Sequence, residues 1–341
     1  LDAWEGGVPP ESEQIAGIKL YYGATNENIP MILYLISWRK DNRVQEGWHA
    51  GYSFLTPSVD RYSLCLAEAI TMGVSTNPGN LAFWDISINK PFQLHFEKIR
   101  QYYNFIEKYE EIYKAKTYSK IGVFFSPKSL VLSGENHTLP ILKKEQAANL
   151  NEVRGSYYSI AETLLKLHQP FKVLVEGKFR EDELKKCDLV IIPFSPVMGD
   201  KTFILLKEFV DNGGILIITD KNAGNYDLFY QLRQKNLLKI LKIPPIAKQM
   251  MSNKSKIIIT LHPNFLGGRF NTHISQNEFN SFDTIVKKNV EEIIQLEGNN
   301  NDLVVVEPTI TKSRNLVIHL LNYNYNLLPY NASQEDILKR E

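Results

Sequence analysis

The stretch CDLVIIPFSPVMGDKTFILLKEFVDNGGILIITD, from Cys187 to Asp220, decides the fold that we predict for this chain. Two continuous apolar runs, Leu189 to Pro193 and Ile215 to Thr219, are typical of strands buried on both faces in a parallel sheet. Between them, apolar residues recur at helical spacing. The pair Gly213-Gly214 predicts the end of this helix, because glycine readily adopts the left-handed conformation of a C-cap. We therefore predict a strand, helix, strand unit with a right-handed crossover.

The regions before and after this stretch continue the alternation of strands and helices. Lys120 to Ser126 is the first predicted strand, and the pattern repeats from there to residue 298. We therefore predict a doubly wound parallel sheet of the flavodoxin-like type over residues 117–298. Its other strands are predicted at Phe171 to Val175 and Ile257 to Leu261, and its other helices at Tyr157 to Leu167, Glu181 to Lys186 and Phe229 to Leu241.

Residues 1–116 show the same alternation, which is typical of an α/β fold. The apolar run MILYLISW, Met31 to Trp38, predicts the clearest strand of this region. A strand end at Leu1 to Trp4 precedes it. The remaining predicted elements are helices at Glu11 to Thr25, Ser58 to Gly73 and Phe92 to Tyr113, and a strand at Val74 to Asn77.

Residues 299–341 change in character, because they contain strand patterns without helices. The two predicted strands are Leu303 to Glu307 and Leu316 to Tyr323. In the second, Val317, His319 and Leu321 alternate with the residues between them, which favours an antiparallel sheet. The sequence therefore predicts three parts, with boundaries near residues 116 and 298.

The composition excludes several classes of function. The chain has 341 residues with 39 Lys and Arg against 38 Asp and Glu, and it has no basic stripe of the kind that binds nucleic acid. No apolar stretch is long enough to span a membrane, and no secretion signal is recognisable. The first residue is not methionine and strand patterns break off at both ends. We therefore expect a fragment, and the sequence leaves its cellular location open.

The central stretch contains no recognisable catalytic or cofactor-binding motif. The chain contains no G-x-G-x-x-G, Walker A or G-x-S-x-G motif, so we expect no cofactor. Ser195 follows a predicted strand, but no glycine-flanked elbow surrounds it, which favours a structural role over that of a nucleophile. Asp200 is predicted to be the N-cap of the next helix.

The cysteines and histidines give no metal pattern. Cys65 and Cys187 are far apart and adjoin apolar runs, so we predict two buried thiols rather than a disulfide. His262 and His273 have no third ligand at a suitable spacing. We therefore expect no metal site.

Residues 1–116 carry the richer chemistry, because all four tryptophans lie there and three of them are at or just past predicted strand ends. Indole faces stack on sugar rings, and sugar hydrolysis needs a pair of carboxyl groups. Glu5 directly follows Trp4, and Asp85 directly follows Trp84. We therefore predict a carbohydrate site with Glu5 and Asp85 as catalytic candidates, while core tryptophans and solvated carboxylates are the alternative. The predicted substrate-binding residues are Trp4, Trp38, Arg39, Trp48, His49 and Trp84.

Several segments resemble the β-galactosidase-like glycoside hydrolases. The segments SLCLAEAITMGVSTNPGN (residues 63–80), FWD (83–85) and IRQYYNFIEKYEEIY (99–113) resemble the last units of the (β/α)8 catalytic barrel of those enzymes. KIGVFFSPKSL (120–130), YYSIAETLLKLHQPFKVLVE (157–176) and the central stretch resemble their next domain, a class I glutamine amidotransferase fold without its catalytic cysteine. NLVIHLLNYN (315–324) resembles the start of their C-terminal β-domain.

The resemblance implies an α/β chain with three domains: the C-terminal part of a (β/α)8 barrel over residues 1–116, a flavodoxin-like domain over 117–298, and the start of an antiparallel β-domain over 299–341. It also implies that about the first five barrel units are missing, and with them the acid/base residue that follows strand four in the family. The family nucleophile belongs after strand seven. If Met31 to Trp38 is that strand, it carries no carboxylate at its end, and Glu5 is a candidate from the preceding strand only.

We therefore interpret the chain as the C-terminal portion of a glycoside hydrolase that acts on carbohydrate O-glycosidic bonds. The alternative is a non-catalytic carbohydrate-binding or oligomerisation protein on the same scaffold. The expected partners are a carbohydrate substrate and further copies of the chain, since the middle domain of the family serves trimer formation. Neither nucleic acid nor a membrane is expected as a partner.

Overall fold

The computed structural model describes residues 11–25, 32–34, 38–40, 52–54, 59–77, 84–85, 90–91, 93–132, 151–220, 222–241, 249–251, 256–259, 276–290, 294, 296 and 304–322. The chain divides into two compact units. The first unit comprises Leu1–Ile15, Pro30–Thr117 and Gly298–Glu341, and the second comprises Ala16–Ile29 and Tyr118–Glu297. The three domains predicted from the sequence stay predictions.

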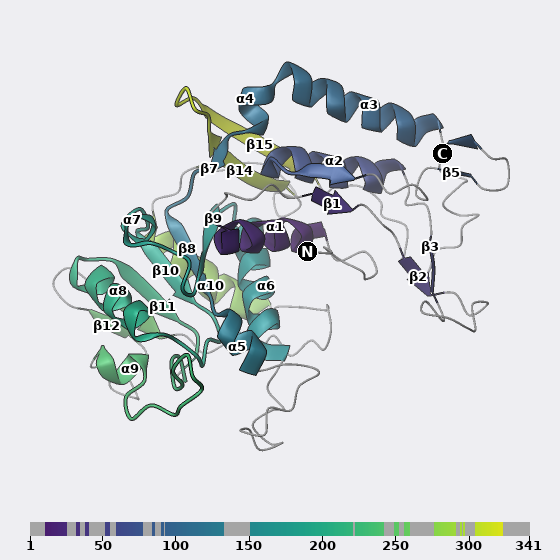
Figure 1. Ribbon diagram of the computed structural model, residues 1–341. Helices are drawn as coiled ribbons and strands as arrows, with labels where there is room; N and C mark the ends of the chain where they lie inside the picture. The colour runs from purple at the N-terminus through teal and green to yellow at the C-terminus, as the bar shows by residue number, and fades with distance from the viewer. Residues whose placement is uncertain are drawn as a thin grey trace. The chain divides into compact units, whose positions relative to one another are not determined.

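A six-stranded sheet forms the centre of the second unit (Figure 1). Its strand order is β12-β13-β11-β10-β8-β9, and all neighbouring pairs are parallel except β12 with β13. The parallel sheet predicted from the central stretch is thus confirmed, whereas β12 was not predicted. The strands are β8 (Ile121–Phe125), β9 (Phe171–Val175), β10 (Leu189–Ile192), β11 (Ile215–Ile218), β12 (Gln249–Met251) and β13 (Lys256–Ile259).

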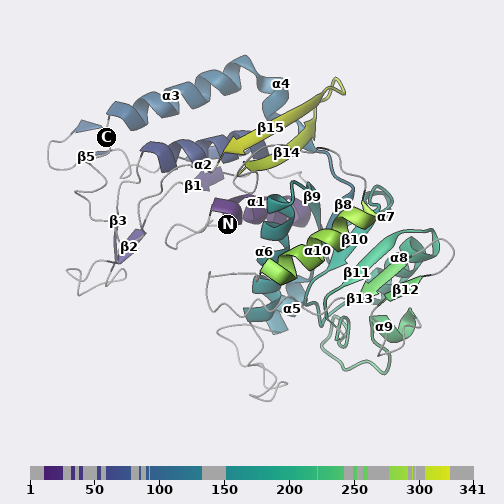
Figure 2. The same cartoon turned by 180° about the vertical axis from the view of Figure 1, so that it is seen from behind.

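Helices lie on both faces of this sheet, α8 on one face in Figure 1 and α6 and α10 on the other in Figure 2. Strand residues that face α8, such as Val190, Ile192, Leu216 and Ile218, are fully buried with Leu206 of α8. Each such side chain contributes about 1.5–3 kcal/mol through burial. The described helices of the second unit are α1 (Glu11–Thr25, from Ala16 onward), α5 (Pro127–Leu132), α6 (Asn151–Lys166), α7 (Glu181–Leu184), α8 (Asp200–Asp211), α9 (Leu237–Ile240) and α10 (Gln276–Asn289).

The helix of the central unit ends as predicted. Helix α8 ends at Asp211, and Gly213 has a φ of 98°, a region that favours glycine. The Gly213 and Gly214 amides donate to the carbonyl oxygens of Val210 and Phe209, each at 2.9 Å, and so satisfy the last helical carbonyls.

The predicted helix from Phe229 to Leu241 is wrong. The structure forms a hairpin over residues 224–233 and a single helical turn, α9, from Leu237. Two polar side chains explain the difference, because both bond to the backbone locally. Asp227 accepts from backbone amides within the hairpin, and Asn236 accepts from Lys239 N at 3.1 Å and so starts α9 only there.

Helix α1 packs tightly against the edge strand β9. The Lys19 ammonium donates to the Phe171 carbonyl oxygen at 3.0 Å, and the Tyr157 hydroxyl of α6 donates to the Ala16 carbonyl oxygen at 2.6 Å. Gly23 lies against the Val173 backbone, so close that a side chain would not fit. Residues from the start of the chain are thus part of the second unit.

The first unit contains short paired strands and the longer helices α2 and α3. Strands β1 and β4 are parallel, and α2 lies between them in the sequence, while β2 pairs with β3 and β5 pairs with β6 in antiparallel fashion. The elements are β1 (Ile32–Tyr34), β2 (Trp38–Lys40), β3 (Tyr52–Phe54), α2 (Val59–Met72), β4 (Ser75–Asn77), β5 (Trp84–Asp85), β6 (Lys90–Pro91), α3 (Gln93–Lys108) and α4 (Glu110–Tyr113).

An antiparallel sheet of order β15-β14-β7 completes the first unit. It contains β7 (Lys116–Thr117), β14 (Val304–Ile310) and β15 (Leu316–Asn322), so the predicted antiparallel strands are confirmed. Strand β14 continues through Pro308 to Ile310, three residues beyond the predicted end. None of the described helices is long and apolar enough to cross a membrane.

Two helical glycines give a matched test of the packing between α1 and β9. A Cβ at Gly23 would lie 2.5 Å from the Val173 carbonyl oxygen, whereas a Cβ at Gly155 of α6 would meet no atom within 4 Å. We expect Gly155→Ala to raise the free energy of unfolding by about 0.5–1 kcal/mol, because alanine has less backbone freedom to lose. We expect Gly23→Ala to lower it by about 1–3 kcal/mol, because α1 must move away from β9. Urea unfolding of both variants measures this, and equal effects would contradict the packing.

Candidate functional site

The carboxyl edge of the parallel sheet is the place where a doubly wound fold binds ligands. Strands β9 and β10 lie on opposite sides of β8, so the chain reverses its direction across the sheet between β8 and β10. Ligands in such folds bind at this switch point, outside the carboxyl ends of the strands. Here Ser126 follows β8, Glu176 follows β9, and residues 193–199 follow β10.

The loop after β10 occupies the switch point of the sheet. The Ser126 hydroxyl donates to the Val197 carbonyl oxygen at 2.8 Å, and the Val197 amide donates to the Ser129 hydroxyl at 2.9 Å. The Phe194 amide donates to the Ser156 hydroxyl at 2.9 Å. Because Val197 is fully buried, the loop after β10 occupies the position where a ligand would lie.

Ser195 is buried within this loop. Its carbonyl oxygen accepts from the Gly224 amide at 2.9 Å, which ties it to the hairpin of residues 224–233. No histidine bonds to its hydroxyl among the described residues. A nucleophile needs an adjacent base, so the geometry supports the structural role predicted for Ser195.

Glu176 is the most perturbed carboxyl group at this edge. Its Oε1 atom accepts a short hydrogen bond from the Thr202 hydroxyl and another from the Gly199 amide at 3.4 Å. Burial raises the pKa of Glu176 to about 7, although both hydrogen bonds and the nearby Arg233 charge lower it. Its Oε2 atom is buried and has no hydrogen-bond partner among the described residues.

Glu176 lies at the start of α8, where the sequence predicted Asp200 as the N-cap. Helix α8 has Gly199 as its N-cap, so Asp200 is its first helical residue and the predicted N-cap is wrong. The Asp200 carboxylate pairs with Arg233 instead. Glu176 directly follows β9. Because its carboxyl group accepts from Gly199 N and the Thr202 hydroxyl, it fixes the position of the first turn of α8.

Arg233 joins the hairpin of residues 224–233 to the same place. Besides its ion pair with Asp200, its Nη2 atom donates to the Met198 carbonyl oxygen at 3.0 Å. Its guanidinium carbon lies 4.8 Å from the centre of the Phe203 ring. Sequence patterns did not single out Glu176 or Arg233, because their partners are 23 to 35 residues away along the chain.

A second buried polar group lies in the antiparallel sheet of the first unit. Glu307 of β14 is directly opposite His319 of β15, and the Thr117 hydroxyl donates to Glu307 Oε1 at 2.6 Å. Burial lowers the pKa of His319, although the Glu307 charge raises it. Glu307 is fully buried, whereas His319 and Thr117 are partly exposed, so the Glu307 carboxyl group bonds to the neighbouring strands and does not face solvent. The described residues contain no group of side chains that could hold a metal ion.

Of the predicted carbohydrate site, Trp4, Glu5, Trp48 and His49 lie outside the described residues. The prediction that Met31 to Trp38 forms one strand is wrong, since β1 ends at Tyr34 and pairs with β4, while β2 starts at Trp38 and pairs with β3. A continuous apolar run does not reveal where the partner strand changes. Arg39, which directly follows the predicted strand, lies in β2 opposite Ser53 and so in a strand of its own.

Trp84 and Asp85 form the short strand β5, where they lie opposite Pro91 and Lys90. For Trp38, Arg39, Trp84 and Asp85 the structure describes the backbone alone. The grouping of the predicted residues into a sugar site therefore stays a prediction.

Comparisons with known proteins bear on the fold. No family model matches the chain, and no curated protein matches it. A β-galactosidase from Bacillus circulans sp. alkalophilus is similar in structure, with a TM-score of 0.63, 12% identity, and coverage of 91% of this chain and 52% of that one. The chain has a β-galactosidase-like fold.

Two further structures agree. The cold-adapted β-galactosidase from Rahnella sp. R3 gives a TM-score of 0.62 at 12% identity over 95% of this chain and 54% of that one. A catalytic mutant of Gan42B, a GH42 β-galactosidase from G. stearothermophilus, gives 0.61 at 13% identity over 91% and 51%. The chain thus spans about half the length of these β-galactosidases, and at this identity the likeness extends to the fold alone.

The raised pKa of Glu176 predicts a pH-dependent stability. In the folded protein this carboxyl group stays protonated up to about pH 7, whereas it ionises near 4.5 when unfolded. Folding stability therefore falls as the pH rises from about 4.5 to about 7, by up to about 3 kcal/mol. We expect Glu176→Gln to remove this fall, as measured by urea unfolding at pH 5 and pH 8. We expect Thr202→Val to extend this fall in stability to higher pH. The Thr202 hydroxyl stabilises the charged form of Glu176, so its loss raises the pKa of Glu176 further in the folded protein. A Glu176→Gln variant with the wild-type pH dependence would contradict the burial of this group.

Proposed function

We propose that the chain is part of a glycoside hydrolase that acts on carbohydrate O-glycosidic bonds in the manner of a β-galactosidase. The observation that carries this proposal is the structural similarity to GH42 β-galactosidases over 91% to 95% of the chain. A fold by itself does not fix a function. The tryptophans and carboxyl groups of residues 1–116 provide the candidate sugar-binding and catalytic residues.

The first unit supplies the proposed site. Strands β1 and β4 are parallel and adjacent, with α2 between them in the sequence, and this β-α-β arrangement supports our proposal that they belong to the end of a (β/α)8 barrel. Glu5 and Asp85 are the proposed catalytic pair. One carboxyl group protonates the leaving oxygen, and the other attacks the sugar carbon or activates water. The proposed binding surface consists of Trp4, Trp38, Arg39, Trp48, His49 and Trp84.

The second unit is proposed to be a flavodoxin-like domain with a structural role. The loop after β10 fills its switch point, as described above. The Cys187 thiol is buried before β10, and burial raises its pKa to about 11. A thiol that stays protonated near neutral pH is a poor nucleophile. The second unit therefore resembles a scaffold more than a catalytic domain.

The alternative is a non-catalytic carbohydrate-binding or oligomerisation protein. One observation favours it, namely that the apolar run Met31 to Trp38 carries no carboxylate at its end, where the resemblance places the family nucleophile. Under this alternative the tryptophans bind sugar, and Glu5 and Asp85 are solvated groups.

Hydrolysis of nitrophenyl glycosides tests the proposal. The measurement uses the 341-residue chain and, where the reading frame extends further, the full-length protein. We expect the full-length protein to release nitrophenol from a β-galactoside, and Glu5→Gln to lower kcat by about 100-fold or more, because it removes a proton donor or nucleophile.

The matched control is Glu107→Gln, since this carboxylate is exposed on α3 and is not assigned to the site. Full activity in Glu5→Gln would remove Glu5 from the site. Binding of galactosides without turnover in the full-length protein would support the alternative, and hydrolysis by the 341-residue chain alone would contradict the expectation that part of the machinery is missing.

A further inference from the structure

The hairpin of residues 224–233 presents two large apolar side chains to solvent. Phe229 is 80% exposed and Leu232 is 72% exposed. Between them, Tyr230 has a φ of 63°, which a bulky residue rarely adopts. Exposed apolar side chains at a strained turn mark the hairpin as a candidate contact surface.

The hairpin is ordered by hydrogen bonds within it and to its neighbours. Asp227 Oδ1 accepts from the amides of Phe229 and Gln231 at 2.8 and 2.9 Å. The Tyr226 amide donates to the Pro196 carbonyl oxygen at 2.9 Å. Because the turn is already ordered, Phe229 can meet a partner without the entropy cost of ordering a loop.

Lysine side chains surround this apolar tip. The Lys128 ammonium of α5 lies 5.4 Å from the centre of the Tyr230 ring, which places the start of α5 beside the hairpin. Exposed lysines follow the carboxyl ends of four neighbouring strands, namely Lys128 after β8, Lys178 after β9, Lys201 after β10, and Lys235 and Lys239 after β11. Within the part of the chain that the structure describes, none of them forms an ion pair.

The described carboxyl groups at this edge do not offset the lysines. Asp200 pairs with Arg233, and Asp227 accepts from the backbone of the turn. Glu176 and Asp220 each have a carboxyl oxygen that is buried from solvent. The carboxyl edge of the sheet therefore carries an excess of exposed positive charge around Phe229 and Leu232.

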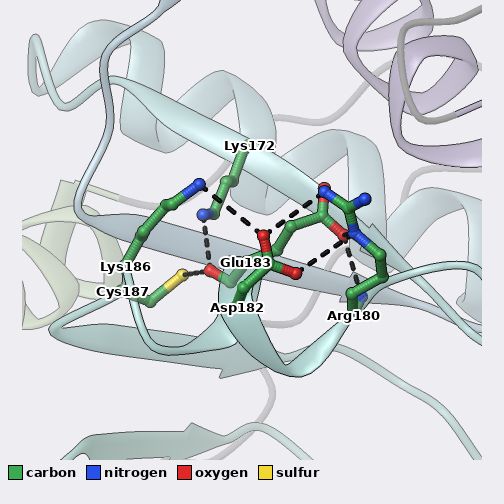
Figure 3. Close-up of polar contacts among 6 residues, drawn as sticks. All are labelled: Lys172, Arg180, Asp182, Glu183, Lys186 and Cys187. Carbon is green, nitrogen blue, oxygen red and sulfur yellow. Dashed lines mark hydrogen bonds and ion pairs between the residues drawn. The ribbon is translucent and has the colours of Figure 1, made fainter.

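The opposite edge of the sheet differs, because its basic side chains pair with carboxylates. Helix α7 leads to the amino end of β10 and lies at the other end of the sheet from α5 and α9 (Figure 1). Figure 3 shows Asp182 of α7 between Arg180, at 3.1 Å, and Lys186, at 3.8 Å. The net charge of +1 for the whole chain is thus unevenly distributed, and the excess of lysines lies on the side of the hairpin.

An apolar tip within a ring of lysines fits the surface of an anionic lipid bilayer. Phenylalanine and leucine side chains enter the boundary between headgroups and acyl chains, and lysines nearby are attracted to anionic headgroups. An acidic polysaccharide would match the lysines as well, but it has no apolar layer to receive Leu232. Adsorption of this kind needs no spanning helix, because only the tip enters the bilayer.

We propose that the carboxyl edge of the second unit adsorbs to anionic lipid surfaces, with Phe229 and Leu232 inserted at the interface and the surrounding lysines against the headgroups. Such adsorption departs from the expectation of no membrane partner, which considered spanning segments only. It also goes beyond the proposed glycosidase function. Its measurement needs no catalysis, so the two proposals fail independently.

Cosedimentation of the 341-residue chain with lipid vesicles tests the adsorption. One set of vesicles contains phosphatidylcholine and phosphatidylglycerol, and the other contains phosphatidylcholine alone. We expect the chain to bind the mixed vesicles at least about 10-fold more strongly, and to lose most of this binding between about 0.1 M and about 0.5 M NaCl, because salt screens the lysines. A chain that stays in the supernatant with the mixed vesicles would overturn the proposal.

Substitution of Phe229 tests the apolar contact. We expect Phe229→Ala to lower the partition coefficient for mixed vesicles by about 10-fold, because it removes the largest inserted side chain. Phe229→Trp should preserve binding, since indole favours the membrane interface. The matched control is Phe96→Ala on α3, where a phenylalanine that is 56% exposed is removed without effect on binding. Equal binding by Phe229→Ala and the unsubstituted chain would contradict insertion of the tip.

Charge reversal tests the role of the lysines. We expect Lys235→Glu to weaken binding to mixed vesicles by about 10-fold or more at low salt. Lys186→Glu, at the opposite edge of the sheet, is the matched control and should leave binding unchanged. Equal losses in both variants would show that total charge, and not this edge, decides binding, and would overturn the proposal.

Two further measurements identify a different partner. Sedimentation velocity without lipid detects contact between copies of the chain, and binding of dextran sulfate detects affinity for a soluble polyanion. If Phe229→Ala abolishes either of these and leaves vesicle binding unchanged, the hairpin serves that partner and the lipid proposal is wrong.

Discussion

Burial of β10 on both faces, between parallel neighbours on both sides, is the constraint on which the second unit depends. Leu189, Val190, Ile191 and Ile192 are all fully buried, and they pair in register with β8 and with β11. A central strand of this kind leaves no backbone group for a ligand and no face for solvent. The chemistry of the unit is therefore confined to the ends of its strands.

At those ends the side chains serve the fold. Ser126 and Ser129 hold the loop after β10, Glu176 holds the start of α8, and Arg233 ties the hairpin to both. Each of these groups would suit a binding site if a ligand replaced its present partner. Because the chain supplies the partners itself, the edge is rigid and closed. The residues proposed for catalysis and sugar binding accordingly belong to the first unit.

The sequence predicted the parts of the fold that depend on local pattern. The strands and the helix between Cys187 and Asp220 were predictable, because continuous apolar runs and a paired glycine have few other interpretations. The hairpin was not, because Phe229 and Leu232 have helical spacing but are exposed, and only the bonds of Asp227 reveal the turn. The raised pKa of Glu176 could not be predicted either, since it depends on burial in the folded protein and on residues far along the chain. For the carbohydrate site, the residue types and their order along the chain predicted the candidate residues. Whether these residues lie together in space depends on segments outside the described residues.

The path of the chain has a consequence for how the protein can be divided. The second unit comprises residues 16–29, which include most of α1, and residues 118–297, so residues 30–117 of the first unit are inserted within it. A shorter chain that began at Tyr118 would lose α1 and leave uncovered the side of β9 to which Lys19 and Gly23 are fitted. It would also leave the Tyr157 hydroxyl without its present acceptor, Ala16. No single cut therefore separates the two units, and α1 can make its contacts with α6 and β9 only after synthesis has passed Val175, the last residue of β9.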